Sequence, residues 1–211
     1  MAKYHYKYRR PQRRRLPFKK ILWCLAALML LAYPFWEAAT LTVEEHTLYV
    51  TDLPANLKNL KIVFASDIHQ CAWFSQSRVN ELIGTINGLN ADIIILGGDY
   101  ATDSDSAIAF FRTAPALHAR LGVFGVLGNH DRTQPESNLG LLMAEMKNYG
   151  CLPLVNTVSR MKLGQTYIYV AGVDDYYNGS PDVAGFLQRG GAGGTGGALC
   201  RPHAGPDARR A

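Results

Sequence analysis

Short apolar runs alternate with longer stretches of helical periodicity along the middle of the chain. The short runs are rich in β-branched residues and predict four strands: Leu60–Ala65, Asp92–Leu96, Gly122–Leu127 and Thr166–Val173. Between them, apolar residues at helical spacing predict three helices: Ser77–Leu89, Ser104–Leu121 and Pro135–Tyr149. Thr40–Val50 alternates apolar and polar residues, as an edge strand does. This alternation predicts an α/β fold whose largely parallel sheet is covered on both faces.

The N-terminal region differs from this pattern. Residues 1–20 contain nine of the 22 Lys and Arg and no acidic residue, whereas residues 21–211 carry a net charge of −4. The 16 residues Ile21–Trp36 are uninterruptedly apolar and would form a helix of roughly 24 Å. We interpret residues 1–20 as a basic cytoplasmic leader and residues 21–36 as a transmembrane signal anchor, which places the rest on the extracytoplasmic side. A cleaved signal peptide and a buried helix are the alternatives.

The C-terminal region also changes character. Residues 183–211 contain eight glycines in 29 positions and show neither strand nor helix periodicity, which predicts a disordered or aberrant tail. The four cysteines lie far apart without metal-binding spacing, so zinc-finger folds are excluded and a disulfide is not required: Cys24, Cys71, Cys151 and Cys200.

Three polar clusters each follow a predicted strand. They are Asp67-Ile68-His69, Gly97-Gly98-Asp99 and Gly128-Asn129-His130-Asp131, about 30 residues apart, which is the length of one strand–helix unit. Because sites in parallel sheets form beyond the carboxyl ends of the strands, the three clusters are expected to converge there. Each cluster alone is typical of an ordinary loop or turn, but the ordered set indicates a functional site.

The residue types in these clusters suit metal chemistry. Asp67 and His69 leave the same face of an extended backbone, and a carboxylate with an imidazole is a common ligand pair for Zn, Mn or Fe. The glycines before Asp99 allow a tight turn that brings its carboxylate close to its neighbours. In the third cluster, the asparagine offers a carbonyl ligand, the histidine an acid or base, and the aspartate a carboxylate that can orient the imidazole.

These clusters resemble the motifs of the calcineurin-like metallophosphoesterase superfamily, which run D-x-H, G-D and G-N-H-D/E, then a lone His and G-H-x-H. The resemblance covers residues 41–182. The leader, the apolar run and Gly172-Val173-Asp174-Asp175 are similar to the family's membrane-anchored bacterial branch. The resemblance implies a four-layer αββα sandwich. It also implies a two-metal phosphoesterase for phosphodiester or pyrophosphate bonds, with lipid-linked substrates similar to UDP-2,3-diacylglucosamine among the candidates.

The resemblance also implies roles for single residues. Two divalent metal ions (Mn, Fe or Zn) are expected: Asp67 and His69 would hold the first, Asp99 would bridge both, and Asn129 would bind the second.

Catalytic roles are implied for two further residues. His130 would protonate the leaving group or stabilise the transition state, with support from Asp131. Asp174 is a candidate substrate-binding residue, with an ordinary turn as the alternative. The family pattern requires three more histidines, but only His203 follows His130 and no G-H-x-H exists. His203 is therefore a candidate extra metal ligand.

This departure leaves two explanations open. Either the domain is incomplete in its C-terminal half, as in a fragment or frameshifted product, or the protein is genuinely short; the abrupt change in composition near Gly185–Gly190 favours the first. Weak or absent hydrolysis is then expected. The leading functional hypothesis is a membrane-anchored, metal-dependent phosphohydrolase, and the alternative is a weak or inert membrane-tethered fragment that binds metal or an anionic partner. Nucleic-acid binding is disfavoured, because the apolar run gives the basic leader a role at the membrane.

Overall fold

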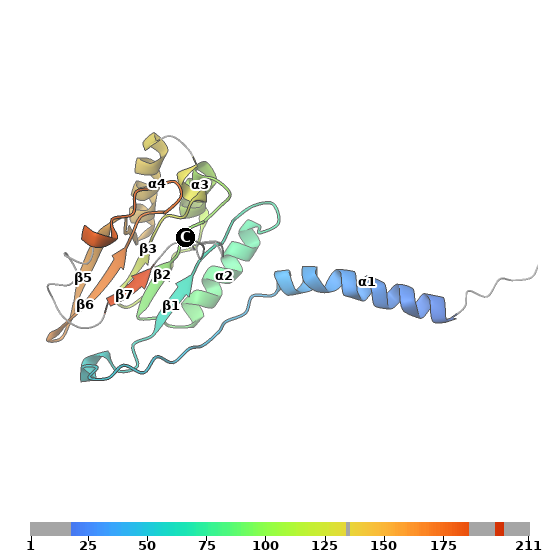
Figure 1. Cartoon of the computed structure of the whole chain (residues 1–211), viewed down its shortest axis with the longest axis horizontal. Helices are drawn as coiled ribbons and strands as arrows, with labels where there is room; N and C mark the ends of the chain where they lie inside the picture. The colour runs from blue at the N-terminus through green and yellow to red at the C-terminus, as the bar shows by residue number, and fades with distance from the viewer. Residues whose placement is uncertain (1–17, 134–135, 186–196, 201–211) are drawn as a thin grey trace, which may run out of the picture. The chain divides into compact units, whose positions relative to one another are not determined.

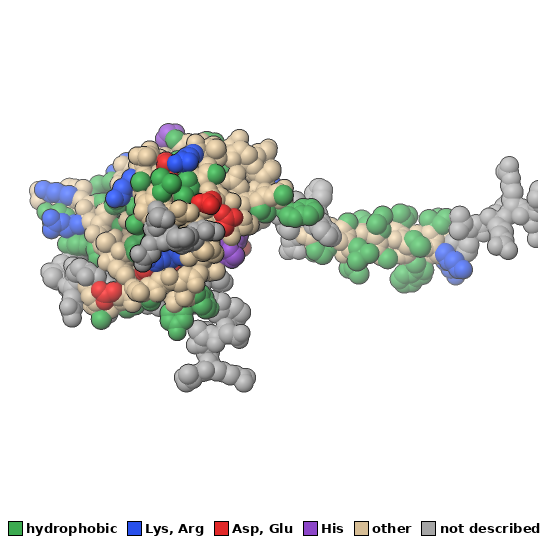
Figure 2. All heavy atoms as spheres, turned by 90° about the horizontal axis from the view of Figure 1, so that it is seen from above, with side chains coloured by type: hydrophobic (Ala, Val, Ile, Leu, Met, Phe, Trp, Pro, Cys, Tyr) green, Lys and Arg blue, Asp and Glu red, His purple; other side chains and the backbone are tan. Residues whose placement is uncertain are grey.

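The computed structural model describes residues 18–133, 136–185 and 197–200, and the chain divides into two units, Met1–Leu48 and Tyr49–Ala211. The first unit contains the 22-residue helix α1 (Phe18–Ala39), along which hydrophobic side chains are exposed (Figure 2). Among the described residues, no helix is both long enough and apolar enough to cross a membrane. The predicted transmembrane segment 21–36 is thus not supported. The edge strand predicted at Thr40–Val50 is wrong, since these residues join no sheet.

The second unit is built on a four-stranded parallel sheet in the order β1-β2-β3-β4 (Figure 1). Its strands are β1 (Ile62–Ala65), β2 (Ile93–Leu96), β3 (Gly122–Gly125) and β4 (Cys151–Pro153). The connecting helices are α2 (Gln76–Gly88), α3 (Ser104–Thr113) and α4 (Glu136–Tyr149), with the short 3-10 helices η1 (Ala55–Leu57) and η2 (His130–Arg132). The predicted α/β fold with a parallel sheet is confirmed.

A second sheet follows in sequence. Strands β5 (Thr157–Leu163) and β6 (Thr166–Gly172) form an antiparallel hairpin, and β7 (Gly197–Cys200) pairs with β6 in parallel. The prediction that residues 183–211 lack regular structure is therefore wrong at β7. The open edge of β6 offers unpaired backbone groups, and pairing with them stabilises a strand even in a glycine-rich segment.

Two apolar clusters lie on the two faces of the parallel sheet. On one face, Ile94 and Leu96 of β2 pack with residues of all three connecting helices, among them Ile83 and Phe110. On the other face lies the second cluster, which joins the two sheets: Leu57, Ile93, Ile95, Phe124, Val126, Leu154, Ile168 and Val170. The described residues thus form a helix layer and two sheet layers. The outer helix layer of the expected αββα sandwich is not among them.

Helix α3 ends eight residues before its predicted boundary at Leu121. Pro115 explains the difference, because the residue before a proline is restricted to extended conformations and Ala114 has ψ 141°. At the other end, the Asp103 side chain accepts a hydrogen bond from the backbone N–H of Ser106, at 2.9 Å. This N-cap fixes where the loop after β2 enters the helix.

The core position of Cys151 gives a testable prediction. The residue is fully buried on β4, and burial raises the pKa of its thiol well above the ordinary value. We expect iodoacetamide at pH 8 to alkylate Cys24, which is exposed, and Cys71, which is half-buried, but to reach Cys151 only after unfolding in urea. Mass spectrometry of the derived peptides measures this order. Rapid labelling of Cys151 in the native protein would contradict the packing of β4.

Candidate metal centre

The loops after β1 and β2 extend the strand pairing beyond the strands themselves. The backbone N–H of Asp67 donates to the carbonyl of Gly98 at 3.1 Å, and that of His69 donates to the carbonyl of Asp99 at 2.9 Å. These bonds set the first two polar clusters side by side at the carboxyl end of the sheet, as the sequence pattern predicts.

The site backbone adopts unusual angles. Asp67, His69 and Asp99 all have positive φ, at 55°, 46° and 54°. Non-glycine residues rarely occupy this left-handed region, and such strain concentrates at functional sites, where neighbouring contacts maintain it. The expected extended backbone at Asp67 and His69 is therefore wrong in detail, although their side chains do reach the same place.

Three side chains converge on one point. One ligand atom from each of Asp67, His69 and Asp99 lies within 4.8 Å of the other two. Nε2 of His69 is 3.9 Å from Oδ1 of Asp67, and both side chains are partly open to solvent, while Asp99 is buried. Two carboxylates and an imidazole at this separation suit a divalent cation, whose charge would offset the repulsion between the carboxylates.

The third cluster closes over Asp99. The backbone N–H of His130 donates to Oδ1 of Asp99 at 2.9 Å. A Cβ on Gly128 would lie 2.2 Å from that same oxygen, and a Cβ on Gly98 would lie 2.4 Å from the Gly128 nitrogen. The two glycines therefore allow the loops after β2 and β3 to touch. That contact brings Asn129 into the same loop cluster as the carboxylates.

His130 is oriented by a backbone carbonyl. Its Nδ1 lies 3.1 Å from the carbonyl oxygen of Thr102, and because a carbonyl only accepts, Nδ1 carries the hydrogen. The ring also meets the His69 ring edge-on, with centroids 4.8 Å apart. Nε2 is thus the nitrogen that can exchange a proton with a bound molecule.

Asp131 does not have the role expected for it. Rather than orienting the His130 imidazole, its carboxylate accepts backbone N–H groups of Asp99 at 2.8 Å, Gly128 at 2.9 Å and Tyr100 at 3.1 Å. Burial raises the pKa of Asp131 to about 7, with a further rise from the charge of Asp99 and a lowering by these N–H groups. Asp131 therefore ties together the loops after β2 and β3. The Thr102 carbonyl, and not Asp131, contacts Nδ1 of the His130 imidazole, which differs from the orienting role predicted for Asp131.

Asp174 is likewise turned inward. Both carboxylate oxygens lie 3.0 Å from Nη1 of Arg132, and the residue is buried. Internal partners occupy its oxygens in this structure, and the substrate-binding role of Asp174 stays a prediction. His203 lies outside the described residues.

Three residues that the sequence analysis did not single out also belong to the site region. They are Thr102, Arg132 and Asn178, which contact His130, Asp174 and the Asn129 carbonyl, respectively. Arg132 could have been found as a cation directly after the third cluster. The other two carry no signal in the sequence, since their contacts depend on loop geometry.

Acidic, imidazole and amide side chains at the carboxyl end of a covered parallel sheet are typical of metal-dependent hydrolase sites. The sequence model of the calcineurin-like phosphoesterases matches residues 60–190, more than half of the chain. The protein belongs to this family, and the predicted resemblance is confirmed.

Curated relatives agree with this assignment. A "Transmembrane protein with metallophosphoesterase domain" from Danio rerio is 30% identical over 135 residues, which cover 60% of this chain and 29% of the relative. The "Uncharacterized metallophosphoesterase YkuE" of Bacillus subtilis is 28% identical over 159 residues, covering 74% of this chain and 55% of the relative. A Helicobacter pylori metallophosphoesterase is 25% identical over 178 residues, covering 77% and 44%. The matches thus span between 29% and 55% of these relatives' lengths.

Proposed function

We propose that this protein hydrolyses phosphodiester or pyrophosphate bonds with the help of two divalent metal ions. The observation that carries the proposal is the convergence of Asp67, His69 and Asp99 to within 4.8 Å, beside the loop that carries Asn129 and His130. When bound, divalent ions at such a site polarise the phosphoryl group and lower the pKa of water.

Four side chains have proposed roles in holding the two ions. Asp67 and His69 would hold one ion and Asn129 the other, with Asp99 between them, since its carboxylate offers two oxygens at the centre of the loop cluster. Asp67, His69 and Asp99 come from two loops, and their carboxylate oxygens and imidazole nitrogen are donor atoms that bind divalent cations. By this criterion Mn, Fe and Zn all fit the site, because carboxylate and imidazole ligands accept all three.

His130 supplies the proton chemistry. With Nδ1 bonded to the Thr102 carbonyl, Nε2 is directed to donate a proton to the leaving oxygen or a hydrogen bond to the charge that develops on the phosphoryl group. Its ring lies against His69, so the proton donor stands beside the metal-binding side chains.

Hydrolysis of bis-p-nitrophenyl phosphate by the full chain tests the proposal. We expect slow turnover that requires Mn²⁺ and is abolished by EDTA. Replacing His130 with glutamine should lower turnover by about 100-fold or more, the usual contribution of a positioned acid, while Mn²⁺ content is unchanged. The matched control is His118→Gln, at an exposed histidine on the loop before β3, which should retain wild-type turnover.

The outcomes separate the competing functions. Turnover equal to the buffer blank, with Mn²⁺ bound, would overturn the hydrolase proposal and favour a metal-binding module without activity. Equal loss in His118→Gln and His130→Gln would show that the activity does not come from this site.

We further propose that α1 attaches the protein to a membrane. Support comes from the exposed apolar side chains of α1, among them Trp23 and Leu30, and from relatives whose names describe transmembrane proteins. Membrane pelleting tests the attachment: release by carbonate at pH 11 would indicate surface binding, release by detergent alone a spanning helix, and recovery in the supernatant would contradict attachment.

A further inference from the structure

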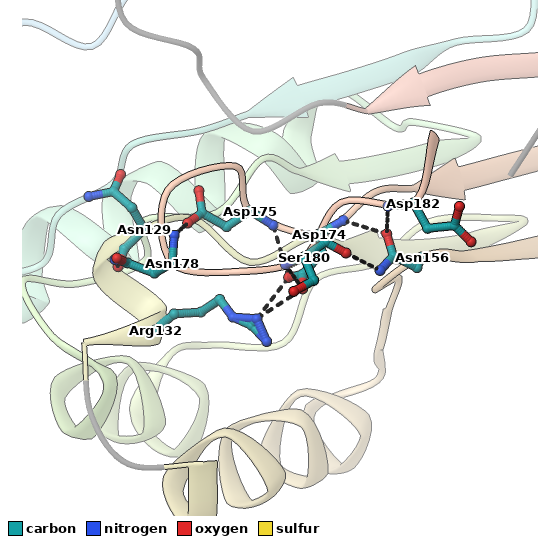
Figure 3. A network of polar contacts seen from close by, with 8 residues as sticks. All are labelled: Asn129, Arg132, Asn156, Asp174, Asp175, Asn178, Ser180 and Asp182. Atoms are coloured by element: carbon teal, nitrogen blue, oxygen red, sulfur yellow. Dashed lines mark hydrogen bonds and ion pairs between the residues drawn. The ribbon is translucent and has the colours of Figure 1, made fainter. Parts of the chain in front are cut away.

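The segment between β6 and residue 182 folds around a buried carboxylate (Figure 3). The Asp174 carboxylate accepts Nη1 of Arg132 at 3.0 Å on both oxygens, the backbone N–H of Asp175 at 2.9 Å and that of Ser180 at 2.9 Å. The side chain of Asp174 is 5% exposed and that of Arg132 is 15% exposed. This ion pair is therefore shielded from solvent and ties η2 to the segment 174–182.

A second link runs through Asn178. The backbone N–H of Asn178 donates to Oδ2 of Asp175 at 2.6 Å, which fixes the residue in place, and Asp175 is itself buried. From there the Asn178 side chain donates through Nδ2 to the backbone carbonyl of Asn129 at 2.9 Å. In Figure 3 the side-chain amide of Asn129 extends away from Asn178. The bond thus holds the backbone and leaves the amide free to act as a ligand.

A third residue closes the segment at its base. Oδ1 of Asn156 accepts the backbone N–H groups of Asp174 at 3.1 Å and Asp182 at 2.9 Å, and Nδ2 donates to the carbonyl of Ser180 at 2.8 Å. One side chain therefore joins the beginning and the end of the segment. A segment braced in this way can serve as a rigid support for η2.

We propose that the segment 174–182 positions Asn129 for metal binding, with Arg132 and Asn178 as its two points of contact. Asp131 secures the same loop from the side of the parallel sheet, by accepting N–H groups of the loops after β2 and β3. Without Asn178, the N–H of Arg132, at 3.4 Å, would be the only remaining donor to the carbonyl of Asn129 among the described residues. The direction of the Asn129 amide would then be less fixed. Arg132 and Asn178 are positioning residues, and this inference rests on the proposed metal role of Asn129.

The test is Mn²⁺ binding to the full chain, measured by titration calorimetry and by the EPR signal of free Mn²⁺. Asn178→Ala should weaken Mn²⁺ affinity by about 10-fold to 100-fold, the usual effect of removing a group that orients a ligand. Its circular dichroism spectrum should match wild type, because Asp174 keeps its partners. The matched control is Asn148→Ala, at an exposed amide on α4, which should bind Mn²⁺ as wild type does.

A double-mutant cycle distinguishes positioning from a general structural effect. If Asn178 acts through Asn129, the variant Asn129→Ala/Asn178→Ala should bind Mn²⁺ as weakly as Asn129→Ala alone. Additive losses, or wild-type affinity in Asn178→Ala, would overturn the inference while leaving the proposed function in place. Wild-type affinity in Asn129→Ala, or a wild-type chain that binds no Mn²⁺, would overturn both.

The ion pair gives a second measurement. Arg132→Ala should weaken Mn²⁺ affinity, and Arg132→Lys should restore part of it, because a lysine ammonium can still pair with Asp174. Equal affinities in the two variants would contradict positioning through the ion pair. If Arg132→Ala does not fold, the Asn178 series still decides the question.

Discussion

Replacing Asp99 with asparagine is expected to lower the Mn²⁺ affinity of the protein by at least about 100-fold and to abolish Mn²⁺-dependent hydrolysis. In the proposed site Asp99 would be the charged ligand shared by both ions, so neutralising it would remove attraction at both. In the wild-type chain the backbone N of His130 lies 2.9 Å from Oδ1 of Asp99. The fold should persist in the variant, since the asparagine carbonyl can still accept this hydrogen bond. Titration calorimetry measures the loss, and thermal unfolding without metal checks the fold.

A matched variant separates the site from the general charge of the protein. Asp105→Asn removes one negative charge from an exposed position near the start of α3 and should leave Mn²⁺ affinity unchanged. Equal losses in the two variants would indicate that Mn²⁺ binds through the overall acidic surface. Unchanged affinity in Asp99→Asn would refute the metal centre.

Much of the parallel sheet could be predicted because its two central strands, β2 and β3, are largely buried on both faces. The run of β2 is apolar at every position, and all four of its residues are buried, so the pattern alone indicates a central strand. The polar clusters follow the strands directly, and for this reason the convergence of Asp67, His69 and Asp99 could be predicted without coordinates.

The second sheet was harder to predict. Strand β5 (Thr157–Leu163) has the sequence TVSRMKL, which is too polar to resemble a core strand. In agreement with this composition, none of its residues is fully buried. It is defined by pairing with β6 over seven residues, and such pairing depends on the hairpin partner. Likewise, β7 forms because β6 has an edge to fill, which the glycine-rich sequence does not indicate.

The roles of the site aspartates show a second limit. Sequence order places Asp131 beside His130 and suggests that the two side chains interact, but η2 turns them in different directions. The three N–H groups that donate hydrogen bonds to Asp131 lie on the loops after β2 and β3. These N–H groups need a shared acceptor only because the two loops approach each other closely. A motif can therefore predict that a residue is needed without predicting what it contacts.

The contact between those loops leads to the largest stability effect that we expect. Replacing Gly98 with alanine should lower the free energy of unfolding by more than about 3 kcal/mol, because two costs combine. The residue has φ 92°, which is unfavourable for a residue with a Cβ. The added Cβ would also lie 2.4 Å from the Gly128 nitrogen, a backbone atom that cannot rotate away. Urea unfolding followed by circular dichroism measures the change.

Gly84→Ala is the matched control, with an expected effect of opposite sign. Gly84 lies inside α2, and a Cβ there would meet no atom within 4 Å. Alanine is preferred over glycine in a helix by about 0.5–1 kcal/mol, so this variant should be slightly more stable than wild type. Similar stabilities for the two variants would mean that the loops after β2 and β3 can separate at little cost. The same contact holds Asp99 against the third cluster. If the two loops could separate easily, the residues of the candidate metal centre would therefore not be held in their relative positions.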